Sequence, residues 1–333
     1  VGAAEATATD VSGGTAGITN AALTDGNIDY GFVLLETADI TIADIDIDEN
    51  ATLYVLDDQI GDDDTLIITG AVDVLTATIL TIELGDVTLT SDTDTVGADS
   101  LTVAIGGALG GTTGSTLSRG GSLLLNGVNG LATTSTVTVA GNTHMTAITV
   151  EGGAGVDSGA VGSIVAATFG DATTDTFDST GLTVTGGAAG TGSVAGGASS
   201  VTIAGTAAIG ADGIILTGGV GAATALGGDS TLTITGATTI TGGAVTVTAG
   251  VGSTGAGGDA ALTFTGAVTS DSTLAIAGKA VSGSDASVTF TGDATFSGIS
   301  LDDTSSAGAS TLTINGTTAQ TITGAITAAA GDE

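Results

Sequence analysis

The sequence repeats one short pattern, in which an apolar residue, threonine, a second apolar residue, a small residue and glycine follow one another. Clear copies begin at Val201, Leu232, Leu262, Val288 and Leu312, and their glycines are 24 to 31 residues apart. Alternation of apolar and polar residues indicates a β-strand with one buried face. Repetition at this spacing is typical of proteins whose similar units stack along an axis. The repeat therefore predicts a stacked, all-β architecture.

The segment 230–259, STLTITGATTITGGAVTVTAGVGSTGAGGD, indicates how one turn of the stack is built. It holds three alternating segments, Leu232–Thr235, Thr239–Thr241 and Val245–Thr248, which are separated by glycines. Three short strands bury little surface alone, so each turn, here called a coil, needs a coil above and below it. Looser copies extend upstream to Leu66. We predict a parallel β-helix, or β-solenoid, of about nine three-sided coils.

The composition fits a narrow interior. Apolar residues make up 41% of the chain and aromatic residues 2%, so the core must consist of thin layers of Val, Ile, Leu and Ala. The chain has 58 glycines and no proline. The glycines separate alternating strand segments, whereas disordered glycine-rich linkers contain proline and few β-branched residues, so the composition argues against disorder. The chain has no cysteine, which excludes disulfides and thiolate metal sites.

The charge balance limits the partners. Two basic residues face 36 acidic ones, for a formal net charge of -34. Nucleic acid is excluded as a partner because phosphate binding needs clustered Lys and Arg. Anionic membrane surfaces are disfavoured for the same reason, and no apolar run reaches the length of a membrane span. Because the sequence starts at Val1 rather than at Met, we expect an exported protein from which a leader is removed.

The N-terminal segment differs from the rest. Residues 1–38 do not match the repeat, and we predict that they form an N-terminal cap or an assembly arm, whereas residues 39–333 form the solenoid body. The end of a stack exposes unpaired backbone, which must be capped or joined to something. Of the 36 acidic residues, 21 lie in the first 100 positions, so negative charge is concentrated toward this end.

A group of aspartates in this acidic part is the candidate metal site. Aspartates alternate along one predicted strand and then fill a turn, and oxygen ligands of this kind suit Ca²⁺. The EF-hand glycine is missing and the glycine-rich nonapeptide of calcium β-rolls does not recur. Two interpretations stay open, a calcium site and a diffuse solvated acidic face, and no cofactor is required. The candidate ligands are Asp44, Asp46, Asp48, Asp62, Asp63 and Asp64.

The sequence contains few side chains that could act as catalytic residues. His144 is the single histidine, so a Ser/His/Asp arrangement would depend on it, and its context indicates a corner between strands. Paired carboxylates on a solenoid occur in polysaccharide-cleaving enzymes. Such sites also carry aromatic platforms or basic groups, whereas this chain has no Trp and two Tyr. We therefore predict that the protein is not an enzyme.

Thr-x-Thr pairs recur along the chain, for example at Thr233 and Thr235 and at Thr263 and Thr265. Stacked on a flat face, such pairs resemble the ice-binding surface of some solenoidal antifreeze proteins. The alternative is that threonine, a β-branched polar residue, suits the outer face of any strand.

Units of the type STLTITGATTITGG, over about residues 66–328, resemble bacterial surface proteins built of β-strand repeats. These include autotransporter passengers and filamentous-haemagglutinin-like adhesins. The resemblance implies export, a right-handed parallel β-helix and a structural or adhesive role. No cap is visible after the last copy, which starts at Ser310.

Together these features predict an extracellular or cell-surface structural protein. The first hypothesis is a subunit of a filament or sheath, a homopolymer in which the open C-terminal coil of one copy contacts the N-terminal region of the next. The alternative is a cell-surface adhesin rod whose loops contact a glycan or a surface.

Overall fold

The computed structural model describes most of the chain from residue 134 onward and parts of the chain before it. The described residues are 21–23, 30–35, 40–42, 45–47, 51–57, 65–74, 79–86, 100–106, 108–113, 116–118, 120–127, 134–156, 161–190, 194–222, 224–252, 256–278, 284–303, 308–315 and 320–328. These residues form strands β1 to β30 and contain no helix. The prediction of an all-β fold is confirmed.

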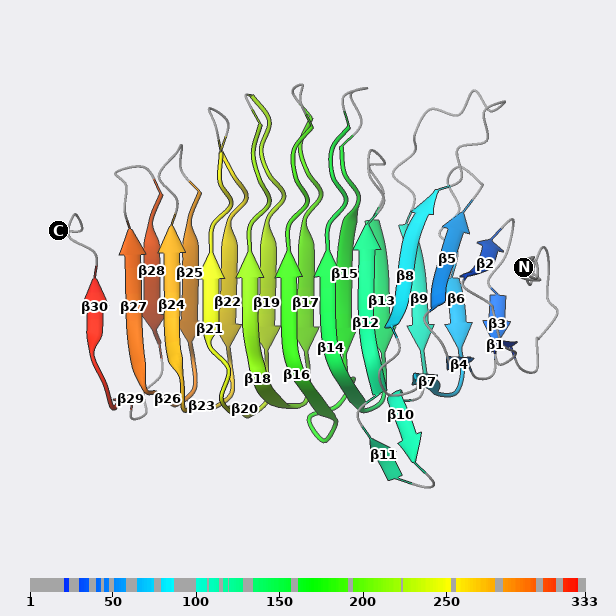
Figure 1. Ribbon diagram of the computed structural model, residues 1–333, viewed down its shortest axis with the longest axis horizontal. Coiled ribbons are helices and arrows are strands. Elements are labelled where there is room, and N and C mark those ends of the chain that lie inside the picture. The colour runs from blue at the N-terminus through cyan, green and yellow to red at the C-terminus, as the bar shows by residue number, and fades with distance from the viewer. Residues whose placement is uncertain are drawn as a thin grey trace, which may run out of the picture.

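The chain winds into a parallel β-solenoid. Figure 1 shows the strands side by side in coil after coil, from the N-terminal end to the C-terminal end of an elongated body. Strands of successive coils pair in parallel, and the short pair of β10 and β11 is the antiparallel exception among the described strands. The handedness of the coil, which the resemblance implies to be right, stays a prediction.

Three rows of strands form the walls. The first row is a ten-stranded sheet of its own, and the other two rows are joined into a twenty-stranded sheet. Strands β14, β16 and β18 run through both the second and the third row.

The first row contains β3 (Ile40–Ile42), β6 (Thr65–Ile68), β9 (Ser100–Ile105), β13 (Thr134–Val139), β15 (Ile164–Phe169), β17 (Ser199–Ile203), β19 (Ser230–Ile234), β22 (Ala260–Phe264), β25 (Ala286–Phe290) and β28 (Ser310–Ile314). The second row contains β1 (Ala21–Leu23), β4 (Ile45–Ile47), β7 (Val72–Val74), β10 (Leu109–Thr113), β20 (Thr238–Ile240), β23 (Val268–Ser270), β26 (Ala294–Phe296) and β29 (Gln320–Ile322), with β11 (Thr116–Ser118) beside β10. The third row contains β2 (Tyr30–Leu35), β5 (Ala51–Asp57), β8 (Ile79–Asp86), β12 (Gly120–Gly127), β21 (Val245–Thr248), β24 (Thr273–Gly278), β27 (Gly298–Asp303) and β30 (Ile326–Ala328). The long strands are β14 (Thr143–Glu151), β16 (Thr176–Thr185) and β18 (Thr206–Thr217).

The number of regular coils is smaller than predicted. About six turns are regular, those from β13 to β27, rather than nine. The prediction counted every copy of the pattern, and the earlier copies include long segments that lie outside the described residues. The strands of the first row nevertheless continue the same pairing upstream to β3.

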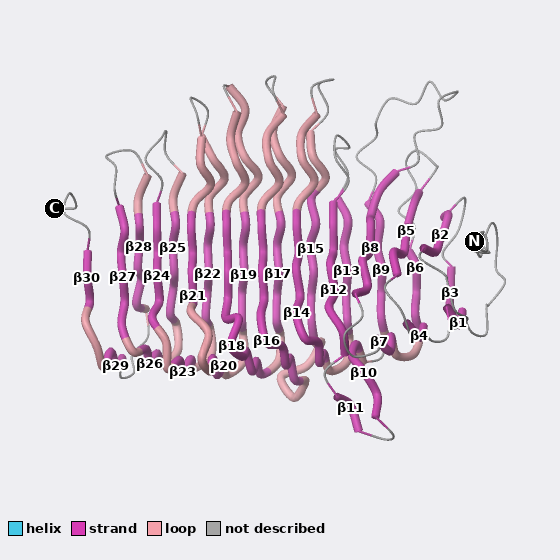
Figure 2. Tube along the Cα trace, in the orientation of Figure 1, coloured by secondary structure: helices cyan, strands magenta, loops and turns pink. Residues whose placement is uncertain are grey.

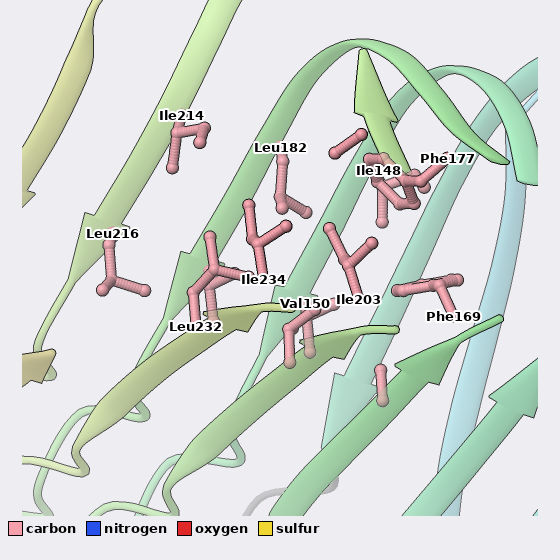
Figure 3. Packing of buried hydrophobic residues seen from close by; sticks show 14 of the residues in the cluster. Ile148, Val150, Phe169, Phe177, Leu182, Ile203, Ile214, Leu216, Leu232 and Ile234 are labelled. Carbon is pink, nitrogen blue, oxygen red and sulfur yellow. The ribbon is translucent and has the colours of Figure 1, made fainter. Parts of the chain in front are cut away.

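The core is a set of apolar columns that run along the axis. In the first row, Leu232 pairs with Leu262 and Ile234 pairs with Phe264, and all four side chains are buried. Figure 3 shows Ile203, Ile234 and Leu216 pointing into the space between the walls. Along each strand, successive residues point alternately inward and outward. Because the register between strands is kept, the inward residues of successive coils form one apolar column.

The N-terminal strands are part of the stack. β1 pairs in parallel with β4, and β2 pairs in parallel with β5. Either a cap or a first coil would pair in this way, and residues 1–20 and 36–39 lie outside the described residues. The predicted division at residue 38 therefore stays a prediction.

Glycine-rich segments between the third and first rows extend the solenoid at one corner. They are here called the glycine extension, and Figure 2 shows them rising together beyond the strands of several coils. Gly187 N–H donates to Gly197 O within one coil at 2.8 Å, and Gly228 N–H of the next coil donates to Gly187 O at 2.8 Å. Backbone hydrogen bonds therefore tie these segments together within and between coils. The extension comprises the described residues 152–156, 161–163, 186–190, 194–198, 218–222, 224–229, 249–252 and 256–259.

Candidate functional site

A column of threonines runs along the outer face of the first row. Seven successive coils place threonine at the same register position, and each side chain is half-buried between its neighbours. The inward neighbours in each strand are apolar, so the alternation of the strand directs the threonines outward. The column consists of Thr138, Thr168, Thr202, Thr233, Thr263, Thr289 and Thr313.

A second outward column lies beside it and holds only small residues. Its members are Thr136, Ala166, Ser200, Thr231, Ala261, Ser287 and Thr311. These two columns are here called the threonine face. Neither column contains a charged residue, although the chain has a formal net charge of -34.

The third row differs, although its strands have the same alternation. Its two outward columns also hold threonine at many positions, but Ile215 and Ala275 interrupt one column, and the other carries the acidic residues Glu151 and Asp302. A general preference of threonine for outward strand positions would act on both rows. What distinguishes the first row is that its two outward columns from β13 to β28 contain no charged residue.

Aspartates form a ladder along one margin of the threonine face. Asp229 Oδ1 accepts the Asp259 N–H at 2.9 Å, Asp259 Oδ1 accepts the Asp285 N–H at 2.7 Å, and Asp285 Oδ1 accepts the Ala309 N–H at 2.7 Å. Burial raises the pKa of Asp259 above 3.8, the Asp285 N–H lowers it, and the charges of Asp229 and Asp285 raise it. The ladder joins successive coils at the cost of placing like charges close together.

The sequence reasoning missed this ladder. The available signal is an aspartate directly before the first-row strand in three consecutive repeats, Asp229, Asp259 and Asp285. Recognising it requires the register between coils, which places each carboxylate beside the next backbone N–H.

A groove of about 550 Å³ lies at the base of the glycine extension. Val161, Ile164 and Leu226 line it with glycine backbone, and Asp229 and Asp259 are at its margin. Each of the three apolar side chains is exposed, so the groove is an open apolar surface. Its chemistry suits a hydrophobic contact rather than bond breaking.

The terminal described coil has an apolar surface. Ile314 of β28 is 45% exposed and Ile326 of β30 is 61% exposed. Their register partners in the preceding coil, Phe290 and Ile299, are 1% and 2% exposed. Ile314 and Ile326 thus occupy core positions that are buried in the preceding coil but are exposed to solvent in the terminal described coil.

His144 lies in β14 rather than at a corner, and its ring is close to two side chains of the next coil. Its Nε2 is 3.1 Å from Thr176 Oγ1, and its Nδ1 is 3.8 Å from Asp178 Oδ2. Hydroxyl, imidazole and carboxylate are the group types of a catalytic triad. The contacts of His144 join one coil to the next. The prediction that the protein is not an enzyme stays a prediction.

Five of the six predicted metal ligands lie outside the described residues, so the predicted site is not tested. Asp46 lies in β4, where it pairs in register with Asp73, whereas Asp44, Asp48, Asp62, Asp63 and Asp64 lie outside the described residues. Among the residues that the structure describes, no group of three or more His, Asp or Glu side chains is placed to hold a metal ion. The calcium site and the absence of a required cofactor stay predictions.

Within the described part of the chain, no helix has the length and apolarity to cross a membrane. No protein-family model, curated protein or solved structure matches the chain.

Proposed function

We propose that this protein is a structural subunit of an extracellular filament or sheath, in which copies stack head to tail along the solenoid axis. The observation that carries the proposal is the match between the two ends of the described stack. All three rows are parallel, so each row begins and ends with strands that run in the same direction.

The strands at the two ends correspond row by row. β28, β29 and β30 each pair with one strand of the preceding coil. β3, β1 and β2 pair in the same way with β6, β4 and β5 at the other end. Because the described stack begins with a second-row strand (β1) and ends with a third-row strand (β30), continuing the helical path sets β29 against β1 and β30 against β2, both in parallel, and leaves the place of one strand between β28 and β3 in the first row. Addition of a strand to an exposed edge is a common mode of recognition.

The terminal coil supplies an apolar contribution to this contact. Ile314 and Ile326 are exposed, whereas Val288, Phe290 and Ile299 of the preceding coil are buried. A next copy that sets β2 against β30 would bury Ile326 as the next coil buries every earlier third-row strand. Each fully buried side chain of this type stabilises the contact by about 1.5–3 kcal/mol.

The geometry of the contact leads to fibres. Contact between two different surfaces of the same chain is heterologous, and translation along the axis does not close into a ring. The net charge of -34 opposes association of copies at low salt. We therefore expect fibres to form more readily when salt screens the acidic surface.

The test is electron microscopy of the purified chain, combined with pelleting at increasing salt. Ile326→Asp places a charge on the terminal coil at a position that is already 61% exposed, so the fold tolerates it. Val251→Asp, at a position 52% exposed in the glycine extension, is the matched control. We expect fibres of uniform width from the parent chain and from Val251→Asp, and none from Ile326→Asp. Fibres from all three chains would refute the proposal.

The groove at the glycine extension favours a second candidate, a cell-surface adhesin rod. Exposed Val161, Ile164 and Leu226 form an apolar surface that could contact a glycan or another surface. Isolated short rods at every salt concentration, together with loss of surface binding in Leu226→Asp, would favour the adhesin over the filament. Loss of fibres in Ile326→Asp alone would favour the filament.

A further inference from the structure

The threonine face has the size of a small protein interface. Seven strands at a spacing of about 4.8 Å give a length of about 30 Å, and five residues per strand give a width of about 17 Å. The face therefore offers about 500 Å² per copy, or about 1,000 Å² for a pair of copies, which is the lower limit for a specific interface. A filament would repeat this area in every subunit and so strengthen the contact.

The shape of the face suits packing against another sheet. Figure 2 shows the first-row strands from β13 to β28 in a regular parallel series along the axis. Large sheets that keep such regularity are typically stabilised by stacking or by side-chain ladders. Small identical side chains that repeat at the strand spacing interdigitate when two sheets meet face to face, at about 10 Å between sheets.

The charge distribution selects a second copy of this chain as the occupant. Two chains of net charge -34 repel each other, and the outward columns from β13 to β28 contain no acidic residue. Third-row positions include Glu151 and Asp302, so close approach through that row would bring carboxylates together. Asp229, Asp259 and Asp285 flank the threonine face, so repulsion at its margin persists until salt screens it.

We propose that two copies pair side by side through their threonine faces, with this uncharged lattice of small side chains as the contact. The pairing deepens the proposed function and rests on it in part, because a closed lateral contact through one face joins two filaments into a doubled filament. The contact itself does not require end-to-end assembly, so the two ideas fail separately.

The test measures the association state of the full chain by sedimentation velocity, in the background of Ile326→Asp to suppress end-to-end stacking. The face variant is Thr233→Glu with Thr263→Glu, which are register partners on adjacent coils. The control is Thr217→Glu with Thr248→Glu, which are also half-buried, outward register partners on adjacent coils but lie in the third row. Both variants change the net charge equally, and circular dichroism checks that both keep the β fold.

We expect the chain that carries Ile326→Asp alone, which is the parent in this experiment, to form dimers that strengthen with salt. The control variant should do the same. The face variant should weaken dimerisation at least about 100-fold, because two like charges are buried against their counterparts. A parent chain that stays monomeric at high salt, or a control variant that dissociates as the face variant does, would overturn the pairing. A monomer that lowers the freezing point and shapes ice crystals would overturn it in favour of ice as the occupant.

A second measurement does not depend on the glutamate variants. The chain has no cysteine, so Thr233→Cys introduces a single thiol near the centre of the face. In a two-fold contact the same patch meets itself. Mild oxidation should therefore give a covalent dimer of Thr233→Cys and little or none of Thr217→Cys. Equal crosslinking of the two variants would count against the pairing.

Discussion

Gly228→Ala tests whether the glycine extension is held together by close backbone packing. A Cβ atom at Gly228 would lie 1.8 Å from Gly197 O and 2.5 Å from Gly197 C. Both are backbone atoms of the preceding coil, so a side-chain rotation cannot relieve the overlap. The two segments must move apart, and the hydrogen bonds at this residue lengthen or break.

The expected cost follows from the contacts. Gly228 N–H donates to Gly187 O at 2.8 Å, and Gly219 N–H donates to Gly228 O at 2.7 Å. Two lost hydrogen bonds cost about 1–3 kcal/mol. Overpacking adds about 1–3 kcal/mol, and the smaller entropy of an unfolded alanine offsets about 0.4–1 kcal/mol. The extension should therefore lose about 1–5 kcal/mol of local stability, with a central value near 3 kcal/mol.

Hydrogen exchange of the backbone amides is the appropriate assay, because stacked repeats open locally and a single global midpoint would hide the effect. A loss of about 3 kcal/mol corresponds to an approximately 100-fold faster exchange at Gly187, Gly219 and Gly228. Val220→Ala, at a position 54% exposed in the same segment, should change exchange by less than about 0.5 kcal/mol. Unchanged exchange in Gly228→Ala would refute the close-packing argument.

Three further outcomes are expected. Phe290→Ala, whose ring centroid lies 5.6 Å from that of Phe264 and 5.5 Å from that of Phe296, should lower the local stability of its coil by about 3–5 kcal/mol, measured by hydrogen exchange of the backbone amides. A loss below about 1 kcal/mol would contradict the packing. Ser230→Ala should stabilise the fold by about 1 kcal/mol in the same experiment, because its buried hydroxyl has no hydrogen-bond partner among the described residues and Ala260 fills the same column. Asp259→Asn should raise stability at neutral pH by less than about 1 kcal/mol, because this group is largely exposed. Since burial raises the folded pKa of Asp259 above 3.8, this carboxyl destabilises the parent as pH rises through the folded pKa, and unfolding at several pH values should show a weaker decline in the variant.

The placement of strands could be predicted from local patterns. Leu232, Ile234, Val245 and Val247 are buried as alternation requires, and the middle segment around Thr239 is β20. Alternation and glycine corners act within a single repeat, so they are visible without knowledge of the neighbouring coils. The number of regular coils was less accessible, because the copies upstream of β13 are irregular in length and composition.

The features that carry the proposals depend on register between coils. The Thr233 column, the Asp259 carboxylate beside the Asp285 N–H, and the contact of Gly228 with Gly197 each join residues 24 to 34 positions apart. Repeat lengths vary and the glycine segments have no alternation, so sequence spacing does not show which residues meet.

The sequence by itself determined that short alternating strands turn at glycines and must stack, because a single repeat cannot bury its own apolar edge. Tertiary structure alone decided which residues share a column, how the glycine segments bond to one another, and which outer wall carries no charge. These depend on the axial alignment of one coil on the next, which hydrogen bonds and core packing select together.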